Sequence, residues 1–178
     1  MTLLFRESLL RADDNGRTIY GLAVPYGVTA TVDDGLGPYR ERFAPGAFTR
    51  SIRERGSKIR LFTMHESRRL PIGRPVDLTE HRDGLHAAFM VAATRDGDEA
   101  LELVRSGTVN GFSIGFAPVR ERKVEGVVER IEASLREVSL VWQPAYESAL
   151  VAGVRSAPAS VSVDVARRRL DLVLKTFS

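Results

Sequence analysis

The sequence contains no cysteine, three histidines and one tryptophan. The lack of cysteine excludes disulfide bonds and a thiol nucleophile, and it fits an intracellular protein. It also excludes a Cys-ligated zinc site, and no histidine pair has a zinc-ligand spacing with a carboxylate partner, so we expect no metal and no cofactor. A long hydrophobic run is missing too. Because Arg6 and Glu7 interrupt the first ten residues, we expect neither a signal peptide nor a membrane contact.

Neither sign of charge dominates, since the sequence has 26 basic and 23 acidic residues and a formal net charge of +3. Acids alternate with bases in 40–42, 53–55 and 120–122, which we interpret as solvated faces. A nucleic-acid-binding domain typically concentrates its basic residues and carries a recognition motif. We therefore expect no specific nucleic-acid partner.

Length and composition predict one domain with a real core, at 178 residues and 43% hydrophobic content. Short apolar-alternating runs separated by turn residues predict strands, and Gly56 and Gly107 are placed to end two helices. The expected class is mainly β with surrounding helices (α+β). We expect strands at 17–25, 38–43, 58–64, 74–80, 84–92, 110–120, 126–132 and 134–142, and helices at 45–55 and 98–106.

The composition changes near residue 154, which predicts the end of the domain formed by 1–154. Residues 155–162 are rich in Ala, Ser and Pro and are expected to form a linker. Residues 163–178 show helical apolar spacing behind Asp164, a plausible N-cap, and predict an amphipathic helix. This helix either folds back, pairs in a dimer, or docks onto a partner. The exposed linker is also a candidate self-cleavage site.

Ser113 lies in a strand-like run in which Phe112, Ile114 and Phe116 share one face. The other face carries Ser113 between two glycines. Small neighbours allow another backbone to approach the hydroxyl, as a substrate strand would, and they equally suit simple close packing. Gly111 to Gly115 also match Gly-x-Ser-x-Gly, but the nucleophile elbow needs a helix next, whereas Pro118 and charged residues follow.

His65 ends the alternating run 58–64 and precedes a loop-like segment, so it is expected at the end of a strand. The other histidines, His81 and His86, flank a predicted hairpin turn and are interpreted as solvated. Glu137 lies inside the strong strand run 135–142. A buried carboxylate needs a partner, so either a histidine N–H or an arginine such as Arg130 should pair with it.

Several segments together resemble the tailed-phage prohead (head maturation) serine protease family between about Tyr20 and Val154. Their order along the chain is typical of that family, and such an ordered set is more specific than any single motif. The segments are Tyr39–Phe48, Met64–Glu66, Leu70–Arg74, Asp83–Leu85, Glu102–Gly107, Gly111–Phe116, Leu135–Val141 and Pro144–Tyr146.

The resemblance implies a serine endopeptidase with the herpesvirus assemblin fold, a closed antiparallel β-barrel with helices around it. It implies Ser113 as nucleophile, His65 as general base and Glu137 as third member. It also implies that the protein cleaves the major capsid protein precursor and scaffold inside the immature head of a bacteriophage or prophage, in the host cytoplasm. A homodimer or a higher oligomer is considered as its oligomeric state.

Two other functions remain open. A catalytically inactive capsid-assembly or scaffold-like module would keep the fold and act by binding. A non-phage esterase would need an apolar lipid pocket, for which the sequence gives no indication. No side chain is assigned as an oxyanion donor, so backbone N–H groups are expected to serve.

Overall fold

The computed structural model describes residues 16–155 except 34, 36 and 147. The expected C-terminal helix at 163–178 and nearly all of the expected linker lie outside this range. Within it, no helix is long and apolar enough to span a membrane. The strands are β1 (Thr18–Pro25), β2 (Ala30–Asp33), β3 (Pro38–Phe43), β4 (Leu61–Thr63), β5 (Gly73–Glu80), β6 (Gly84–Val91), β7 (Gly111–Val124), β8 (Val127–Val141) and β9 (Val151–Arg155), with helices α1 (Thr49–Arg55) and α2 (Arg95–Arg105) and the 3-10 turn η1 (Gly56–Lys58).

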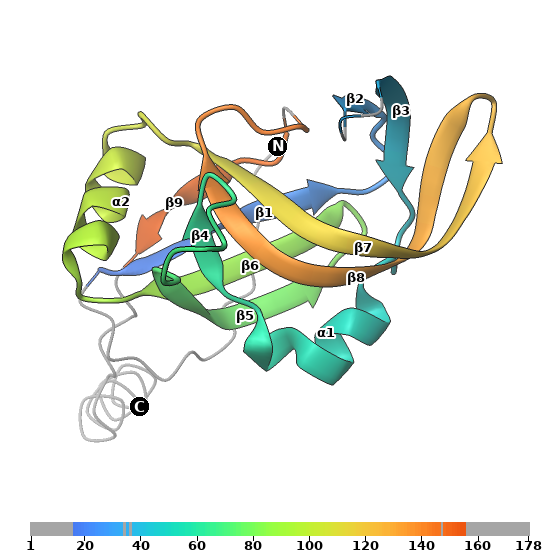
Figure 1. The fold of residues 1–178 in the computed structure, drawn as a ribbon. Helices are drawn as coiled ribbons and strands as arrows, with labels where there is room; N and C mark the ends of the chain where they lie inside the picture. Colours follow the sequence, from blue (N-terminus) through green and yellow to red (C-terminus); the bar gives the residue numbers. More distant parts are fainter. Residues whose placement is uncertain (1–15, 34, 36, 147, 156–178) are drawn as a thin grey trace, which may run out of the picture.

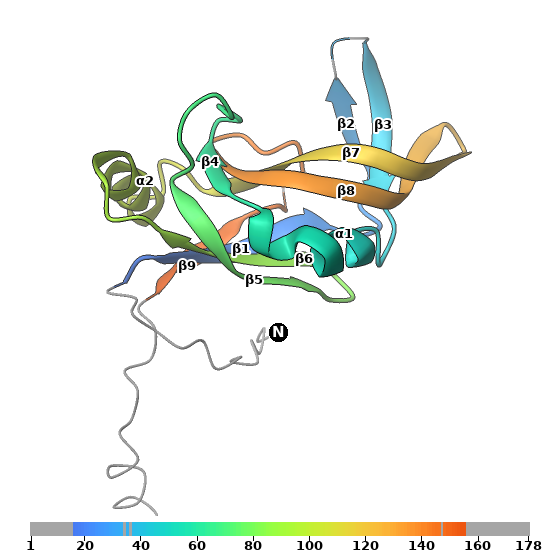
Figure 2. The same cartoon turned by 60° about the horizontal axis from the view of Figure 1, so that its bottom comes forward.

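The expected mainly β architecture is confirmed, with one nine-stranded sheet among the described residues. The sheet curves over itself. Strands β7 and β8 form one layer above β1, β5, β6 and β9, with α1 at one side and α2 at one end (Figures 1 and 2). The hydrophobic core lies between these layers and includes the fully buried Phe43, Phe48, Phe89 and Phe112.

A closed and wholly antiparallel barrel is not confirmed. The strand order is an open path, β2-β3-β8-β4-β5-β6-β1-β9, with β7 paired to β8. Among the described residues, one isolated bridge, Gly111 to Leu150, joins the start of β7 to the segment before β9. The sheet is also mixed, because β3 and β4 both run parallel to β8.

The parallel pairing has a physical cause in the connection between β3 and β4. Strand β3 pairs with the first part of β8 and β4 with its last part, while α1 occupies the gap between them. The helix supplies partners there: Ser51 Oγ accepts the Leu135 N–H at 2.9 Å, and the Ala47 carbonyl just before α1 accepts the Ala133 N–H at 2.8 Å. The chain therefore travels along one edge of β8 without reversing direction, and both strands stay parallel to it.

Strands β7 and β8 form one long hairpin (Figure 1). The separate strands expected at 126–132 and 134–142 are one continuous strand, β8, because Ala133 keeps its place in the ladder opposite Pro118. The turn uses Glu125 and Gly126, whose φ angles of 51° and 78° suit a two-residue hairpin loop. The predicted β5–β6 hairpin is confirmed, and His81 is exposed in its turn. The interpretation of His86 as a solvated turn residue is wrong, because His86 lies in β6 with 19% of its side chain exposed and its Nε2 3.0 Å from Asp83 Oδ1.

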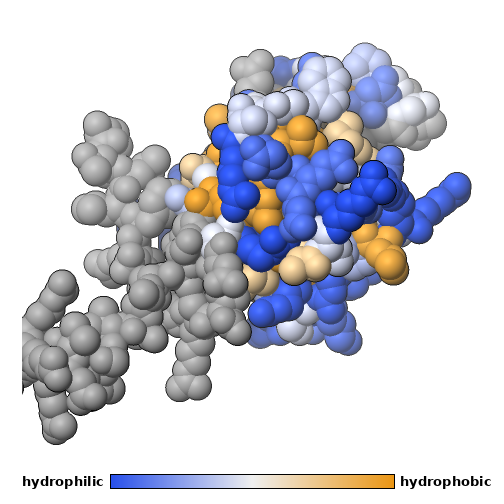
Figure 3. Space-filling view, turned by 90° about the vertical axis from the view of Figure 1, so that its left-hand side faces the viewer, coloured by the Kyte–Doolittle hydropathy of each residue, from blue (hydrophilic) through white to orange (hydrophobic). Residues whose placement is uncertain are grey.

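Helix α2 begins earlier than expected, at Arg95, because the Thr94 hydroxyl accepts the Gly97 N–H and caps the first turn. Its apolar face, including Leu101 and Val104, is buried against the sheet. The face of the molecule at this end is largely hydrophilic, with smaller apolar areas between the charged side chains (Figure 3). Helix α1 is shorter than expected and starts at Thr49, since 45–48 form turns.

The interpretation of 40–42 and 120–122 as fully solvated is wrong for Glu41, which is 3% exposed. Its carboxylate accepts hydrogen bonds from Arg130 Nε at 2.7 Å and from the Tyr146 hydroxyl at 3.1 Å. Arg130 also contacts Glu121 and donates to the Tyr39 hydroxyl at 2.8 Å. Alternating charges do not reveal which member turns inward, because β3 lies between β2 and β8 and presents alternate residues to different environments.

Candidate active site

His65 lies directly beyond β4, where the backbone turns away from the sheet. Met64 and His65 both have left-handed backbone angles, with φ values of 50° and 58°. Such angles are costly for residues other than glycine and cluster at functional sites. Two hydrogen bonds hold the turn to β8: the Met64 N–H donates to the Leu140 carbonyl at 3.0 Å, and the His65 N–H donates to Ser139 Oγ at 3.2 Å.

Glu137 is the partner of His65. The carboxylate Oε1 lies 2.6 Å from His65 Nδ1, and Oε2 accepts the Ser139 hydroxyl at 2.8 Å. The Glu137 side chain is 12% exposed, whereas the His65 side chain keeps 42% of its surface accessible. Of the partners considered from the sequence, the structure therefore selects the histidine rather than Arg130, which pairs with Glu41.

The Glu137 contact orients the imidazole and favours its charged form. The hydrogen bond to Glu137 raises the pKa of His65 above its ordinary value near 6.5, and partial burial opposes the rise. With Nδ1 directed to the carboxylate, Nε2 is the ring nitrogen left for another group. A neutral His65 in this tautomer carries its lone pair on Nε2, as a general base requires.

Ser113 lies on β7, one strand away from Glu137 and Ser139. The register of the β7–β8 ladder puts Ser113 directly opposite Ser139, and Gly115 opposite Glu137. Residues directly opposite in an antiparallel pair share a face, so all four positions point to the same side of the hairpin. Ser139 in turn contacts both Glu137 and His65. The structure thus brings His65 into contact with Glu137 and places Ser113 on the neighbouring strand, opposite Ser139.

The glycines on either side of Ser113 have a different role from the one their spacing suggested. A Cβ atom on Gly115 would lie 2.7 Å from Glu137 Oε1, and one on Gly111 would lie 2.8 Å from Pro144 Cδ. The protein's own side chains therefore occupy this space, rather than leaving it open to a substrate strand. Gly115 makes room for the carboxylate, and Gly111 accepts the loop that follows β8.

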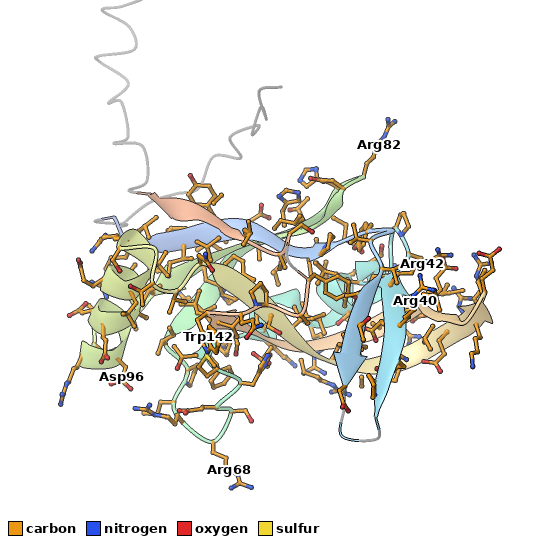
Figure 4. The ribbon with its side chains drawn as sticks, turned by 90° about the horizontal axis from the view of Figure 1, so that it is seen from above. Arg40, Arg42, Arg68, Arg82, Asp96 and Trp142 are labelled. Carbon is orange, nitrogen blue, oxygen red and sulfur yellow. The ribbon has the colours of Figure 1, made fainter. Side chains whose placement is uncertain are left out.

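That loop carries an exposed aromatic residue at the same end of the sheet. Trp142 directly follows β8 and is 63% exposed. Figure 4 shows Trp142 near the loop after β4, whose tip carries Arg68 pointing away from the body. Tyr146 anchors the Trp142 loop through its bond to Glu41. Sequence reasoning missed this anchor and the contacts of Ser139, because neither has a local signature.

Among the described residues, no three His, Cys, Asp or Glu side chains form a group that could hold a metal ion. The polar side chains of this region include a hydroxyl, an imidazole and a carboxylate, the three groups that triad hydrolases use for nucleophilic attack on a carbonyl. Residues 6–162 match the family described as Caudovirus prohead serine protease. The chain belongs to this family.

Two known proteins illustrate the relationship. The chain is 27% identical over 159 residues to the prohead protease of Enterobacteria phage HK97, covering 87% of this chain and 68% of that protein. In structure, it resembles the KSHV protease crystallised with a hexapeptide phosphonate inhibitor, with a TM-score of 0.53. The two share 14% sequence identity, and the match covers 89% of this chain and 76% of that one. The herpesvirus likeness supports the assemblin-like fold. The chain is therefore a prohead serine protease, a hydrolase of phage capsid assembly and virion maturation.

Proposed function

We propose that this prohead serine protease uses Ser113 as nucleophile, His65 as general base and Glu137 as the residue that orients His65. Nε2 of His65 takes the proton from the Ser113 hydroxyl as its oxygen attacks a substrate carbonyl. The protonated imidazole then donates that proton to the leaving amine, which gives an acyl-enzyme. Water, deprotonated by His65, attacks the ester and releases the second product.

The contact that carries this proposal is the 2.6 Å approach of Glu137 Oε1 to His65 Nδ1. It supports different roles for the two ring nitrogens, because Nδ1 contacts Glu137, whereas Nε2 has no hydrogen-bond partner among the described residues. A purely structural ion pair would not need a histidine with 42% of its side chain accessible, held at a left-handed backbone angle beside a serine-bearing strand. Glu137 stabilises the imidazolium as it forms, which follows from the raised pKa of His65.

The proposed substrates are the major capsid protein precursor and the scaffold of the phage or prophage. The setting is the immature head in the host cytoplasm. The kinship with the HK97 prohead protease supports these substrates and this setting. The proposal includes a homodimer or a higher oligomer as the form of the protease, which sedimentation analysis would measure. A further part of the proposal is the domain division, with 1–154 as the protease domain and 155–162 and 163–178 as linker and helix.

Co-expression with the capsid precursor tests the proposal. Ser113→Ala and His65→Ala should each abolish cleavage, with rates lowered by several orders of magnitude, because members of a triad act as a unit. His81→Ala is the matched control, since His81 is exposed in the β5–β6 turn, and it should process the precursor normally. Normal processing by Ser113→Ala would contradict the assignment of the nucleophile.

Labelling with a serine-directed fluorophosphonate separates the protease from the alternative, a catalytically inactive capsid-assembly or scaffold-like binding module. The wild type should be labelled at Ser113, and the label should disappear in Ser113→Ala. A binding module that uses the same fold without the chemistry would leave the reagent unreacted.

A further inference from the structure

Ser139 is fully buried, at 0% exposure, yet both hydrogen bonds of its side chain go to residues of the site. Its hydroxyl donates to Glu137 Oε2 at 2.8 Å and accepts the His65 N–H at 3.2 Å. One small side chain thus links the carboxylate on β8 to the backbone that carries the imidazole. It also lies directly opposite Ser113 in the β7–β8 ladder.

The chain offers a useful comparison in Ser51, another buried serine whose hydroxyl accepts a backbone N–H. Ser51 is 6% exposed and binds the Leu135 N–H at 2.9 Å. That bond joins α1 to β8 and involves none of His65, Ser113 or Glu137. Loss of either hydroxyl leaves a buried N–H unpaired, at a similar cost in stability. The two serines differ in one respect: loss of the Ser139 hydroxyl also releases the side chains of Glu137 and His65, whereas loss of the Ser51 hydroxyl does not.

The Ser139 hydroxyl restricts two motions, rotation of the Glu137 carboxylate and relaxation of the His65 backbone. The terminal torsion of a glutamate side chain is broad, so a carboxylate held through one oxygen can rotate, whereas one held through both cannot. The left-handed φ of 58° at His65 is costly and persists only where the surroundings hold it. Without Ser139, Glu137 keeps only His65 as its hydrogen-bonding partner within the described part of the chain, and His65 loses its backbone anchor to β8.

We propose that Ser139 is a positioning residue of the protease, whose hydroxyl fixes the orientation of the Glu137 carboxylate and the backbone of His65 at the same time. This role rests on the proposed function of His65, Ser113 and Glu137. Ser139 acts through these residues and does not itself touch the substrate. It keeps the imidazole in its contact with Glu137.

The experiment compares full-length wild type, Ser139→Ala, Ser139→Cys and Ser51→Ala. The first measurement is the rate of fluorophosphonate labelling of Ser113. Because misplacement of a catalytic group by about 1 Å can cost about 100-fold, Ser139→Ala should be labelled about 10-fold to 100-fold more slowly. Ser139→Cys should lie between it and the wild type, since a thiol is a weaker donor. Ser51→Ala should react at the wild-type rate.

The second measurement does not depend on catalysis. NMR titration follows the three histidine rings, with the His65 signal identified by its loss in His65→Asn. Because the bond to Glu137 raises the pKa of His65, a loosened carboxylate should let that pKa fall toward 6.5 in Ser139→Ala. In Ser51→Ala the His65 pKa should not change. Thermal denaturation checks that each variant is folded, and Ser139→Cys replaces Ser139→Ala in both measurements if the latter does not fold.

Slower labelling together with a lowered His65 pKa, seen for Ser139 and not for Ser51, supports the proposal. A wild-type rate in Ser139→Ala, an unchanged His65 pKa, or equal effects of the two serine variants would each contradict it. Failure of the wild type itself to react would instead contradict the proposed function. The two failures are thus distinguishable.

Discussion

Gly115→Ala should slow the protease without unfolding it. The added Cβ would lie 2.7 Å from Glu137 Oε1, which is 0.7 Å short of the 3.4 Å at which ordinary contact begins. Gly115 does not have a left-handed φ, so the backbone accepts alanine. The atoms in the way, Oε1 at 2.7 Å, Cγ at 3.0 Å and Cδ at 3.2 Å, all belong to the Glu137 side chain, which is therefore expected to move rather than the strand.

The expected magnitudes follow from this geometry. A carboxylate displaced by up to about 0.7 Å loses much of its 2.6 Å contact with His65, and displacements on this scale cost about 10-fold to 100-fold in rate. Alanine is favoured over glycine in a strand by roughly 0.5–1 kcal/mol. Because the displaced carboxylate stays near His65, whose side chain is 42% exposed, the weakened pair costs about 1 kcal/mol, so these terms nearly cancel and Tm should change by no more than about 4 °C.

Fluorophosphonate labelling of Ser113 measures the activity, and thermal denaturation measures the stability. Gly56→Ala serves as the control, because its Cβ would meet Ile52 Cγ2 at 3.5 Å, an ordinary contact, and it should react at the wild-type rate. Labelling of Gly115→Ala at the wild-type rate would refute the conclusion that Gly115 makes room for a catalytic carboxylate. A large fall in Tm would show that the strand, rather than the carboxylate, had moved.

Two further perturbations test the electrostatics of the site and of the core. Glu137→Gln should lower the plateau rate and move the acidic limb of the pH–rate profile to lower pH, because only neutral His65 is a base and Glu137 raises its pKa above 6.5; an unmoved limb would count against His65 as that base. The His65–Glu137 pair stabilises the fold fully below pH 6.5, and this stabilisation is lost as the pH rises through the raised pKa of His65. The Tm values of wild type and Glu137→Gln, measured across this pH range, should therefore differ most at its acidic end. Glu41→Gln should lower the unfolding free energy by about 3 kcal/mol in urea titrations, because it leaves the buried Arg130 charge poorly paired; a loss below about 1 kcal/mol would mean that Glu121 alone suffices for Arg130.

The sequence by itself determined the local elements and the identity of the candidate site residues. Alternation of apolar side chains predicted most of the strands, since successive side chains of a strand point to opposite faces and this pattern can be read along the chain. The edge strands β2 and β9 were missed, being short and held by their partners β3 and β1. The ordered set of family motifs identified His65, Ser113 and Glu137, which are separated by dozens of residues.

The tertiary structure alone decided how these elements pair and what each site residue contacts. The parallel pairing of β3 and β4 with β8 depends on α1 filling the gap between them, which no local pattern encodes. The same holds for the burial of Glu41 and for the space that Gly115 leaves for the Glu137 carboxylate. It also holds for the two hydrogen bonds that Ser139 makes, one with Glu137 and one with His65. Each depends on contacts between strands distant in sequence, and the free energy of such contacts is set by packing geometry rather than by residue type.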